Sequence, residues 1–407
     1  MEIPAENENP SGLDLEAIYS AVSSFSRGQS PSKKESDTMR YRVRTPTLWV
    51  LVVTFTFLLG CARRSELSKE TEARHLFSIT VGGKGGYIDE AGQIVVQPHF
   101  DLALPFNDRF AVVSVGGKQG YIDKSGRLII EPQFDSADPF VHDLAAVVVD
   151  GKTGMIDRGG KFVVPPRFDI LMPLSDDDLI LVELDKQWWF IDRNGAIVIR
   201  PQFDEPTAFY DGLAGVRLGA HTGYIDRTGT FAVNPTFEKG KLFQEHLAAV
   251  EQNGKWGYIS KTGHYVIAPR FDDCGNFDDG VAPVCVGHKW GYIRKDGEFL
   301  AQPQFTETRR FEGGLAPVCL NGKWGYVNKR GVLAISARFD EVESFESELA
   351  PVRVGQQWGF INKMGMMSVP LQFDKARPFK DGLALVALGD KWGYIDQTGK
   401  YIWMPTR

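Results

Sequence analysis

The amino-acid sequence repeats itself with a period of 34 residues. Versions of the segment 314–331 (Gly-Leu-Ala-Pro-Val-Cys-Leu-Asn-Gly-Lys-Trp-Gly-Tyr-Val-Asn-Lys-Arg-Gly) recur from near residue 76 to the C-terminal end. The residue after the Trp-Gly step recurs at intervals of 34, with one interval of 35, at Tyr87, Tyr121, Met155, Phe190, Tyr224, Tyr258, Tyr292, Tyr326, Phe360 and Tyr394. A fixed period of this size is typical of a repeat architecture. We therefore expect ten copies of one unit, and not the two or three domains that 407 residues ordinarily indicate.

Each repeat reads as three short strands. A Leu-Ala-x-Val strand such as residues 247–250 is joined to a Trp-Gly-Tyr-Ile strand by a turn such as Asn253-Gly254, and Asn-Gly between apolar runs is a strong hairpin signal. The second turn is Asp-x-x-Gly, as in residues 123–126, which is typical of a type I turn. A third strand ends at Pro-x-Phe-Asp, and a loop with another aromatic residue leads to the next unit.

The predicted fold is all-β: ten three-stranded antiparallel repeats of about 34 residues, stacked as a solenoid or superhelix. Period-2 alternation puts Trp324 and Tyr326 on one side of their strand and Val327 on the other, so we expect neighbouring units to cover both sides. A closed β-propeller is the alternative, although propeller blades usually have four strands and about 40 to 45 residues. Prolines such as Pro283 inside the first strand indicate that this strand is an edge.

The first 75 residues differ from the repeats. Residues 1–38 are rich in Ser, Glu, Asn and Pro, so we expect a disordered extension, or a stretch ahead of a true start at Met39. Residues 39–60 combine three arginines with an apolar run at 48–59, the pattern of a signal peptide. Residues 61–75 then form a tether to the array at 76–407.

Residues 58–61, Leu-Leu-Gly-Cys, resemble the lipobox of bacterial lipoproteins. The resemblance implies cleavage before Cys61, acylation of Cys61, and a lipid anchor in the cell envelope. Ala62 is not the Asp that tends to retain such lipoproteins on the inner membrane, so the outer membrane, on its periplasmic side, is the expected location. A single-pass signal anchor remains the alternative, because the apolar run is short for a span of roughly 20 residues but does not exclude one.

The repeats resemble the WG repeat family, named for a Trp-Gly pair. That pair stands in the later units, where its tryptophans are Trp256, Trp290, Trp324, Trp358 and Trp392. Gly85, Gln119, Thr153 and Thr222 replace the Trp in earlier units. The resemblance implies a bacterial all-β repeat protein of unassigned biochemical activity, and it implies no catalytic residues.

Two recurring acidic positions are the main candidates for chemistry. One lies in the Asp-x-x-Gly turn, for example Asp123, and the other follows the Pro-x-Phe step, for example Asp272. The first is Arg294 in one unit and the second is Thr306 in another, so we expect turn caps at both positions and no metal site. The chain has no known nucleophile or zinc motif, so we expect no enzyme activity and no cofactor. A net charge of −6 offers no basic stripe for a phosphate backbone, so we expect no nucleic-acid partner.

Two functions remain. The first is a non-enzymatic scaffold, anchored in the envelope, that binds a protein or another envelope component. The second is a glycan- or peptidoglycan-binding module that uses the repeat tryptophans, although such rings are more often structural. The irregular fourth unit, with an acidic insertion at 175–178, offers Trp188, Trp189 and Phe190 as a candidate contact site.

The cysteines give two further expectations. Cys285 and Cys319 occupy the same position in adjacent repeats, so a disulfide between them is possible in an oxidising compartment if their Cα atoms are close enough. Cys274 stands where other units have a small Ala. We expect Cys274 to be buried and unpaired.

Overall fold

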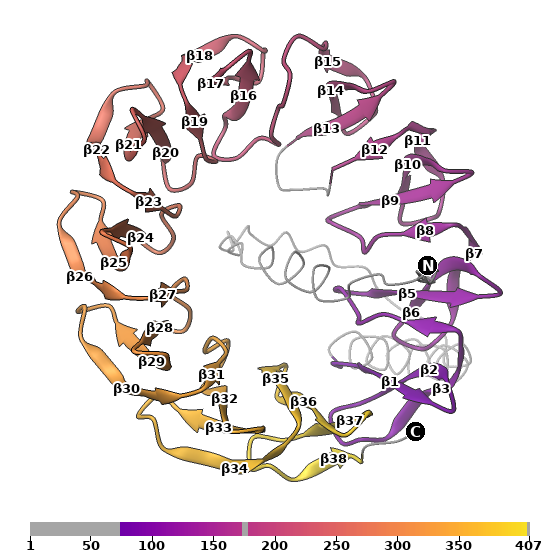
Figure 1. Ribbon diagram of the computed structural model, residues 1–407. Helices are drawn as coiled ribbons and strands as arrows, with labels where there is room; N and C mark the ends of the chain where they lie inside the picture. Colours follow the sequence, from indigo (N-terminus) through magenta and orange to yellow (C-terminus); the bar gives the residue numbers. More distant parts are fainter. Residues whose placement is uncertain (1–73, 173–177, 405–407) are drawn as a thin grey trace, which may run out of the picture. The chain divides into compact units, whose positions relative to one another are not determined.

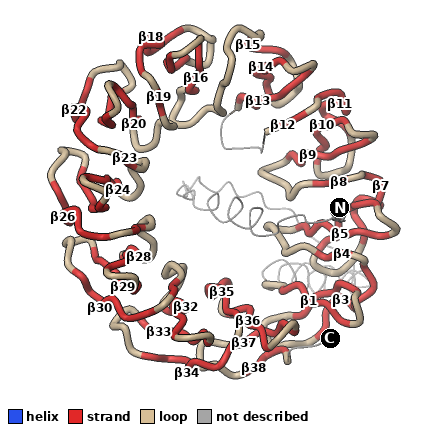
Figure 2. Tube along the Cα trace, viewed as in Figure 1, coloured by secondary structure: helices blue, strands red, loops and turns tan. Residues whose placement is uncertain are grey.

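The computed structural model describes residues 74–172 and 178–404, which belong to the second of two compact units, Ser65–Arg407. All regular elements in these residues are β-strands (Figure 2). Within the described residues, no helix is long and apolar enough to cross a membrane. The predicted signal peptide, Cys61 and most of the acidic insertion at 175–178 lie outside this part of the chain.

The described residues form ten small antiparallel sheets that follow one another around a common axis (Figure 1). The first and last sheets meet, so the array is a closed ten-bladed β-propeller. The all-β prediction is therefore confirmed. The preferred arrangement, an open solenoid, is wrong, and the alternative of a propeller is the observed one.

Blades 1 to 5 follow the chain in order. Their strands are β1 (Phe77–Val81), β2 (Lys84–Ile88) and β3 (Ile94–Phe100) in blade 1; β4 (Leu102–Ala103), β5 (Phe110–Val115), β6 (Lys118–Asp123) and β7 (Leu128–Phe134) in blade 2; β8 (Ser136–Ala137), β9 (Leu144–Val149), β10 (Lys152–Asp157) and β11 (Phe162–Phe168) in blade 3; β12 (Ile170–Leu171), β13 (Leu179–Leu184), β14 (Gln187–Asp192) and β15 (Ile197–Ile199) in blade 4; β16 (Ala214–Leu218), β17 (His221–Ile225) and β18 (Phe231–Phe237) in blade 5.

Blades 6 to 10 complete the ring. Their strands are β19 (Lys239–Gly240), β20 (Leu247–Gln252), β21 (Lys255–Ser260) and β22 (Tyr265–Phe271) in blade 6; β23 (Asp273–Cys274), β24 (Val281–Val286), β25 (Lys289–Arg294) and β26 (Phe299–Phe305) in blade 7; β27 (Glu307–Thr308), β28 (Leu315–Leu320), β29 (Lys323–Asn328) and β30 (Leu333–Phe339) in blade 8; β31 (Glu341–Val342), β32 (Leu349–Val354), β33 (Gln357–Asn362) and β34 (Met367–Phe373) in blade 9; β35 (Lys375–Lys380), β36 (Leu383–Leu388), β37 (Lys391–Ile395) and β38 (Tyr401–Trp403) in blade 10.

Eight of the ten sheets have a fourth strand that the sequence did not predict. It is the innermost strand, most often only two residues long, and it lies in the segment that we read as a loop. Two residues are too few to show the alternation that identifies a strand. The sequence predicts that the Leu-Ala-x-Val strand is an edge. That prediction is wrong in these eight sheets, because the inner strand pairs with it. In blade 7, Gly275 N donates to Pro283 O at 2.8 Å, so the proline contributes its carbonyl group to this pairing.

In blades 1 to 3 and 5 to 9, the outer strand bulges around the glycine at the position of the Trp-Gly step. In blade 6, Trp256 pairs with Phe271 and Tyr258 with Ile267, so one residue, Gly257, lies opposite three. A Cβ atom on Gly257 would lie 2.5 Å from Ile267 O and 2.7 Å from Pro269 N. Glycine is therefore required because the outer strand crosses directly over its Cα atom.

The apolar core lies between the blades. One cluster joins Trp256, Tyr258 and Phe271 of blade 6 to Ala282 and Val284 of blade 7, and the equivalent clusters recur around the ring. Both sides of each middle strand are covered, as predicted. Alanines of the Leu-Ala-x-Val strand lie near the axis, while phenylalanines of the outer strand lie near the rim. We infer that this gradient in side-chain volume turns each blade relative to the last, and so closes the ring.

Contacts between blades 1 and 10 close the ring without a shared strand. Tyr394 packs against Phe77, with ring centroids 5.4 Å apart, and its hydroxyl donates to Ser78 O at 2.9 Å. His75 Nδ1 lies 3.4 Å from Asp381 Oδ2. The same kind of contact joins blades 5 and 6, where His246 Nδ1 lies 3.1 Å from a carboxylate oxygen of the equivalent loop.

Candidate functional site

The Asp-x-x-Gly turns are capped by their first residue. In blade 2, Asp123 Oδ1 accepts hydrogen bonds from Ser125 N at 2.9 Å and Arg127 N at 3.1 Å. The equivalent residues of other blades do the same: Asp89, Asp157, Asp192, Asp226, Asn328, Asn362 and Asp396. The turn-cap prediction is confirmed for these eight blades, because the side-chain oxygen satisfies backbone N–H groups.

The second acidic column links neighbouring blades. The sequence predicts turn caps at this position, and the structure shows this different role. Asp101 lies between blades 1 and 2, where its Oδ1 accepts from Lys84 Nζ at 2.5 Å and its Oδ2 accepts from Gly116 N at 2.7 Å. Equivalent carboxylates hold equivalent hairpins: Asp135, Asp169, Asp272 and Asp340. The hydrogen bond from the lysine is the main reason that the pKa of each of these carboxyl groups lies below its ordinary value.

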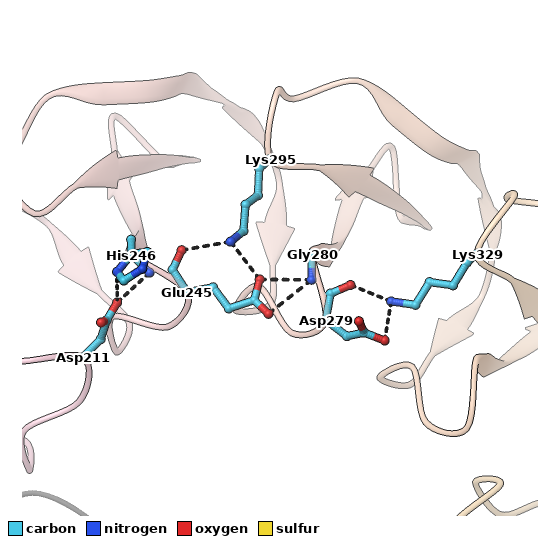
Figure 3. Close-up of polar contacts among 7 residues, drawn as sticks. All are labelled: Asp211, Glu245, His246, Asp279, Gly280, Lys295 and Lys329. Atoms are coloured by element: carbon cyan, nitrogen blue, oxygen red, sulfur yellow. Dashed lines mark hydrogen bonds and ion pairs between the residues drawn. The ribbon is translucent and has the colours of Figure 1, made fainter. Parts of the chain in front are cut away.

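The opposite face of the ring carries a second chain of contacts, which the sequence reasoning missed (Figure 3). Glu245 of blade 6 accepts from Gly280 N at 3.0 Å and pairs with Lys295 Nζ at 3.0 Å, both from blade 7. Lys329 of blade 8 reaches back to Asp279 at 2.9 Å. The sequence does contain a signal for these contacts, namely a basic residue at the second position of the turn after the Trp-Gly strand. This residue recurs from blade 2 to blade 9: Lys124, Arg158, Arg193, Arg227, Lys261, Lys295, Lys329 and Lys363.

The recurring tyrosine, which seven of the ten units carry, also joins blades. Tyr258 is fully buried, and its hydroxyl donates to Gly275 O of the next blade at 2.7 Å. Tyr87, Tyr121, Tyr224, Tyr292 and Tyr326 make the equivalent bond. Burial raises the pKa of these phenols well above its ordinary value, so they stay protonated and remain donors.

The repeat tryptophans are largely structural. Trp256, Trp324 and Trp358 are 7 to 8% exposed, and Trp290 and Trp392 are half-buried. A cation lies over four of the five rings: Lys241 over Trp256, Arg309 over Trp324, Arg353 over Trp358 and Lys375 over Trp392. Buried and covered rings have no free face for a sugar, which argues against the glycan-binding alternative.

The candidate site in blade 4 is a local rearrangement of the core. Phe190 is 2% exposed, while Trp188 and Trp189 are half-buried against two core clusters. Trp189 stands at the position of the bulge glycine, and its Nε1 is buried with no hydrogen-bond partner among the described residues. The outer strand β15 has three residues, compared with seven in β22. Of the acidic insertion, Asp178 is described and lies 3.5 Å from Arg193.

The described cysteines are free and buried. The possible disulfide between Cys285 and Cys319 is therefore not formed in this structure, where the two thiols belong to different blades. Cys274 is 1% exposed and free, as predicted. Burial raises the pKa of the Cys274 thiol to about 11, so this group is not an activated nucleophile at neutral pH.

The outer wall of blades 8 and 9 exposes an apolar patch, which the sequence reasoning also missed. It consists of Val332 (57% exposed), Leu333 (37%), Met364 (74%), Met366 (55%) and Met367 (43%). These residues lie at or just before β30 and β34, which are neighbours at the rim (Figure 1). The stretches 328–339 and 362–373 contain four basic residues and no acidic residue. We call this surface the outer-wall patch.

Among residues 74–172 and 178–404, no group of three or more His, Cys, Asp or Glu side chains is placed to hold a metal ion. One cavity, of about 320 Å³, lies at the inner strands of blades 7 and 8 and is also lined by Lys241 of blade 6. It is lined by Lys241, Asp273, Cys274, Gly275, Pro283, Trp290, Glu307 and Thr308.

These features define a class of protein: a closed β-propeller whose blades are copies of one short repeat. The family described as WG containing repeat matches residues 86–118, 120–152, 154–188, 190–220, 223–256, 256–290, 290–324, 324–357 and 358–392. The matches cover well over half of the chain, so the protein belongs to the WG-containing repeat family. No curated protein has a matching sequence.

Solved structures resemble the fold at low sequence identity. A structure titled as the eukaryotic initiation factor has a TM-score of 0.51 and 13% identity, over 74% of this chain and 96% of its own. Hsv2p from Kluyveromyces lactis has a TM-score of 0.35 and 10% identity, over 56% of this chain and 94% of its own. PorZ from Porphyromonas gingivalis has a TM-score of 0.28 and 9% identity, over 75% and 52%. At such identities the first likeness bears on the fold alone.

Proposed function

We propose that this protein is a non-enzymatic scaffold, displayed from the cell envelope, that binds a protein partner. The outer-wall patch carries the proposal. Methionine is unbranched and polarisable, so it adapts to the shape of a partner, and exposed methionines are frequent at binding surfaces. Arg330 flanks the patch, is exposed, and makes no side-chain hydrogen bond or ion pair with any described residue. The partner surface that fits is therefore apolar with acidic residues at its margin.

The engagement of the recurring polar residues supports a role without catalysis. One acidic column caps turns and the other links blades. Buried tyrosines, and lysines at the surface, also join one blade to the next. Enzymes need acid–base or nucleophilic groups that are free to react with a substrate. The recurring groups of this propeller are instead held by structural hydrogen bonds.

The docking prediction is tested by photo-crosslinking in cells. A crosslinking amino acid placed at Met364 of the full chain should capture one defined partner, and Met366→Asp should remove that adduct because a charge opposes apolar contact. Ser125 is the matched control, since it occupies the same turn position in blade 2 but has no apolar patch beside it. Equal adducts from positions 364 and 125, or an adduct that persists in Met366→Asp, would contradict the proposal.

We further propose that Cys61 carries the lipid anchor. The support is the Leu-Leu-Gly-Cys motif after an apolar run. A fatty-acid analogue should label the wild-type protein and not Cys61→Ser, and the variant should leave the membrane fraction. Several acyl chains are needed for a stable anchor, since one chain gives only marginal membrane binding. An unlabelled wild-type protein in the soluble fraction would refute this proposal.

A further inference from the structure

Blade 7 differs from its neighbours in what covers its tryptophan. In blades 6, 8, 9 and 10, a basic side chain of the same blade lies over the indole ring, at 4.7, 4.8, 6.0 and 5.9 Å from its centroid. Those cations come from three positions of the repeat. Lys241 and Arg309 share the first position, Arg353 occupies the second, and Lys375 occupies the third. In blade 7 the same positions hold Gly275, Cys285 and Asp273. No cation among the described residues lies over Trp290.

The cavity of about 320 Å³ lies at this uncovered ring. Its lining brings together Trp290, Gly275 and Asp273 of blade 7 with Glu307 of blade 8. Gly275 is part of the reason for the opening, because it has no side chain where Arg309 crosses the ring of the next blade. Trp290 is half-buried and Glu307 is exposed, so solvent reaches the site. We call this site the blade 7 slot.

The charges around the slot favour a positive ligand. The backbone of Glu307 pairs with β28, but its carboxylate makes no hydrogen bond or ion pair with any described residue. Asp273 is already held, with its Oδ1 at 3.2 Å from Lys241 Nζ. Lys241 is itself held, since it also donates to Cys274 O and lies over Trp256. One carboxylate therefore remains unpaired beside an indole face, and that face attracts cations.

We propose that the blade 7 slot binds an organic cation, a guanidinium or an alkylammonium group, with Trp290 beneath it and Glu307 as its counter-ion. The four covered blades show the same chemistry within the chain, with lysine or arginine as the occupant. Blade 7 lacks its own occupant and leaves the place for an external one. The cavity volume falls in the range of small-ligand pockets, so the slot holds a whole side chain or a small molecule. This proposal does not depend on the outer-wall patch, which lies at the rim on blades 8 and 9.

Calorimetric titration of the full-length protein in detergent tests the slot. N-acetylarginine amide and N-methylguanidinium should bind with dissociation constants on the order of 1 mM, while the neutral N-acetylcitrulline amide should not bind. Added salt should weaken the binding. A pentapeptide that contains arginine identifies the source of the cation. Tighter binding of the peptide indicates a partner's side chain, and binding equal to that of the amide indicates a free small cation.

Three variants decide whether the binding occurs at Trp290. Cys285→Arg should occupy the slot from within, as Arg353 does in blade 9, and weaken binding about ten-fold or more. Glu307→Gln, at an exposed position, should weaken it several-fold without disturbing the fold. Trp256→Phe is the control, because Lys241 already covers that ring and binding should not change. Absence of saturable binding by the wild-type protein, or wild-type binding by both Cys285→Arg and Glu307→Gln, would overturn the proposal.

Discussion

Replacement of Gly257 by alanine is expected to lower the free energy of unfolding by about 3 kcal/mol or more, at the upper end of what overpacking costs. The added Cβ atom would meet Ile267 O at 2.5 Å, Pro269 N at 2.7 Å and Ala268 C at 2.9 Å. These are backbone atoms, so no side chain can turn aside to make room. Chemical denaturation measures the loss, and hydrogen exchange should show it first in the outer strand β22.

Gly254→Ala is the matched control for this substitution, because Gly254 lies three residues earlier, in the turn that precedes β21. Gly254 has a φ of +67° and nothing within 4 Å of an added Cβ, so only backbone strain of about 1 kcal/mol is expected there. Blade 4 shows the structural outcome of a side chain at the bulge position. With Trp189 there, the cross-strand pair equivalent to Trp256 and Phe271 is missing. If both alanine variants were equally stable, steric crossing of the outer strand would not be the reason for glycine.

Tyr394→Ala is expected to destabilise the protein by about 3 to 5 kcal/mol, the usual loss for removing a large buried aromatic side chain. Tyr394 is 9% exposed, packs on Phe77 and bonds to Ser78 O. No peptide link joins blades 1 and 10 in this interface. We therefore expect the loss to concentrate there, as faster hydrogen exchange in β1 to β3 and β35 to β38 than elsewhere.

Tyr326→Ala separates this closure effect from the general cost of a lost aromatic residue. Tyr326 makes the equivalent contacts inside the ring, with its hydroxyl 2.8 Å from Glu343 O and its ring 4.9 Å from that of Phe345. The chain itself still connects blades 8 and 9 in this variant. We expect a similar loss of stability but no preferential exchange in the first and last blades. Identical exchange patterns in the two variants would show that the closure is no weaker than an internal interface.

The repeat unit was predictable because its signals are local. Asn253-Gly254 fixes a hairpin whose two central residues have φ of 53° and 67°, and Asp123 caps a turn with its own side chain. Each of these interactions spans only a few residues. The inner strands escaped prediction because two residues carry no periodicity. The proline-based expectation of an edge failed because Pro283 accepts a hydrogen bond through its carbonyl oxygen.

The candidate sites were less predictable, because they depend on contacts between repeats. Trp188 and Trp189 look exceptional in the sequence, yet the structure packs them against the core of blade 4. Trp290 looks ordinary in the sequence. Trp290 becomes distinct only in the tertiary structure, where Lys241 and Arg309 cover the equivalent tryptophans and Gly275 leaves Trp290 uncovered.

The sequence by itself determined the number of units, the three longer strands of each unit with their hairpins, and the two sides of each middle strand, since these follow from residue type and from spacing within one period. Only the tertiary structure decided that the array closes into a ring. Closure depends on the small rotation between one blade and the next. We attribute that rotation to the way in which Phe271 and Ala282 fill the space between two blades, at different distances from the axis. A packing angle of this kind arises between repeats, and a sequence pattern within each repeat does not specify it.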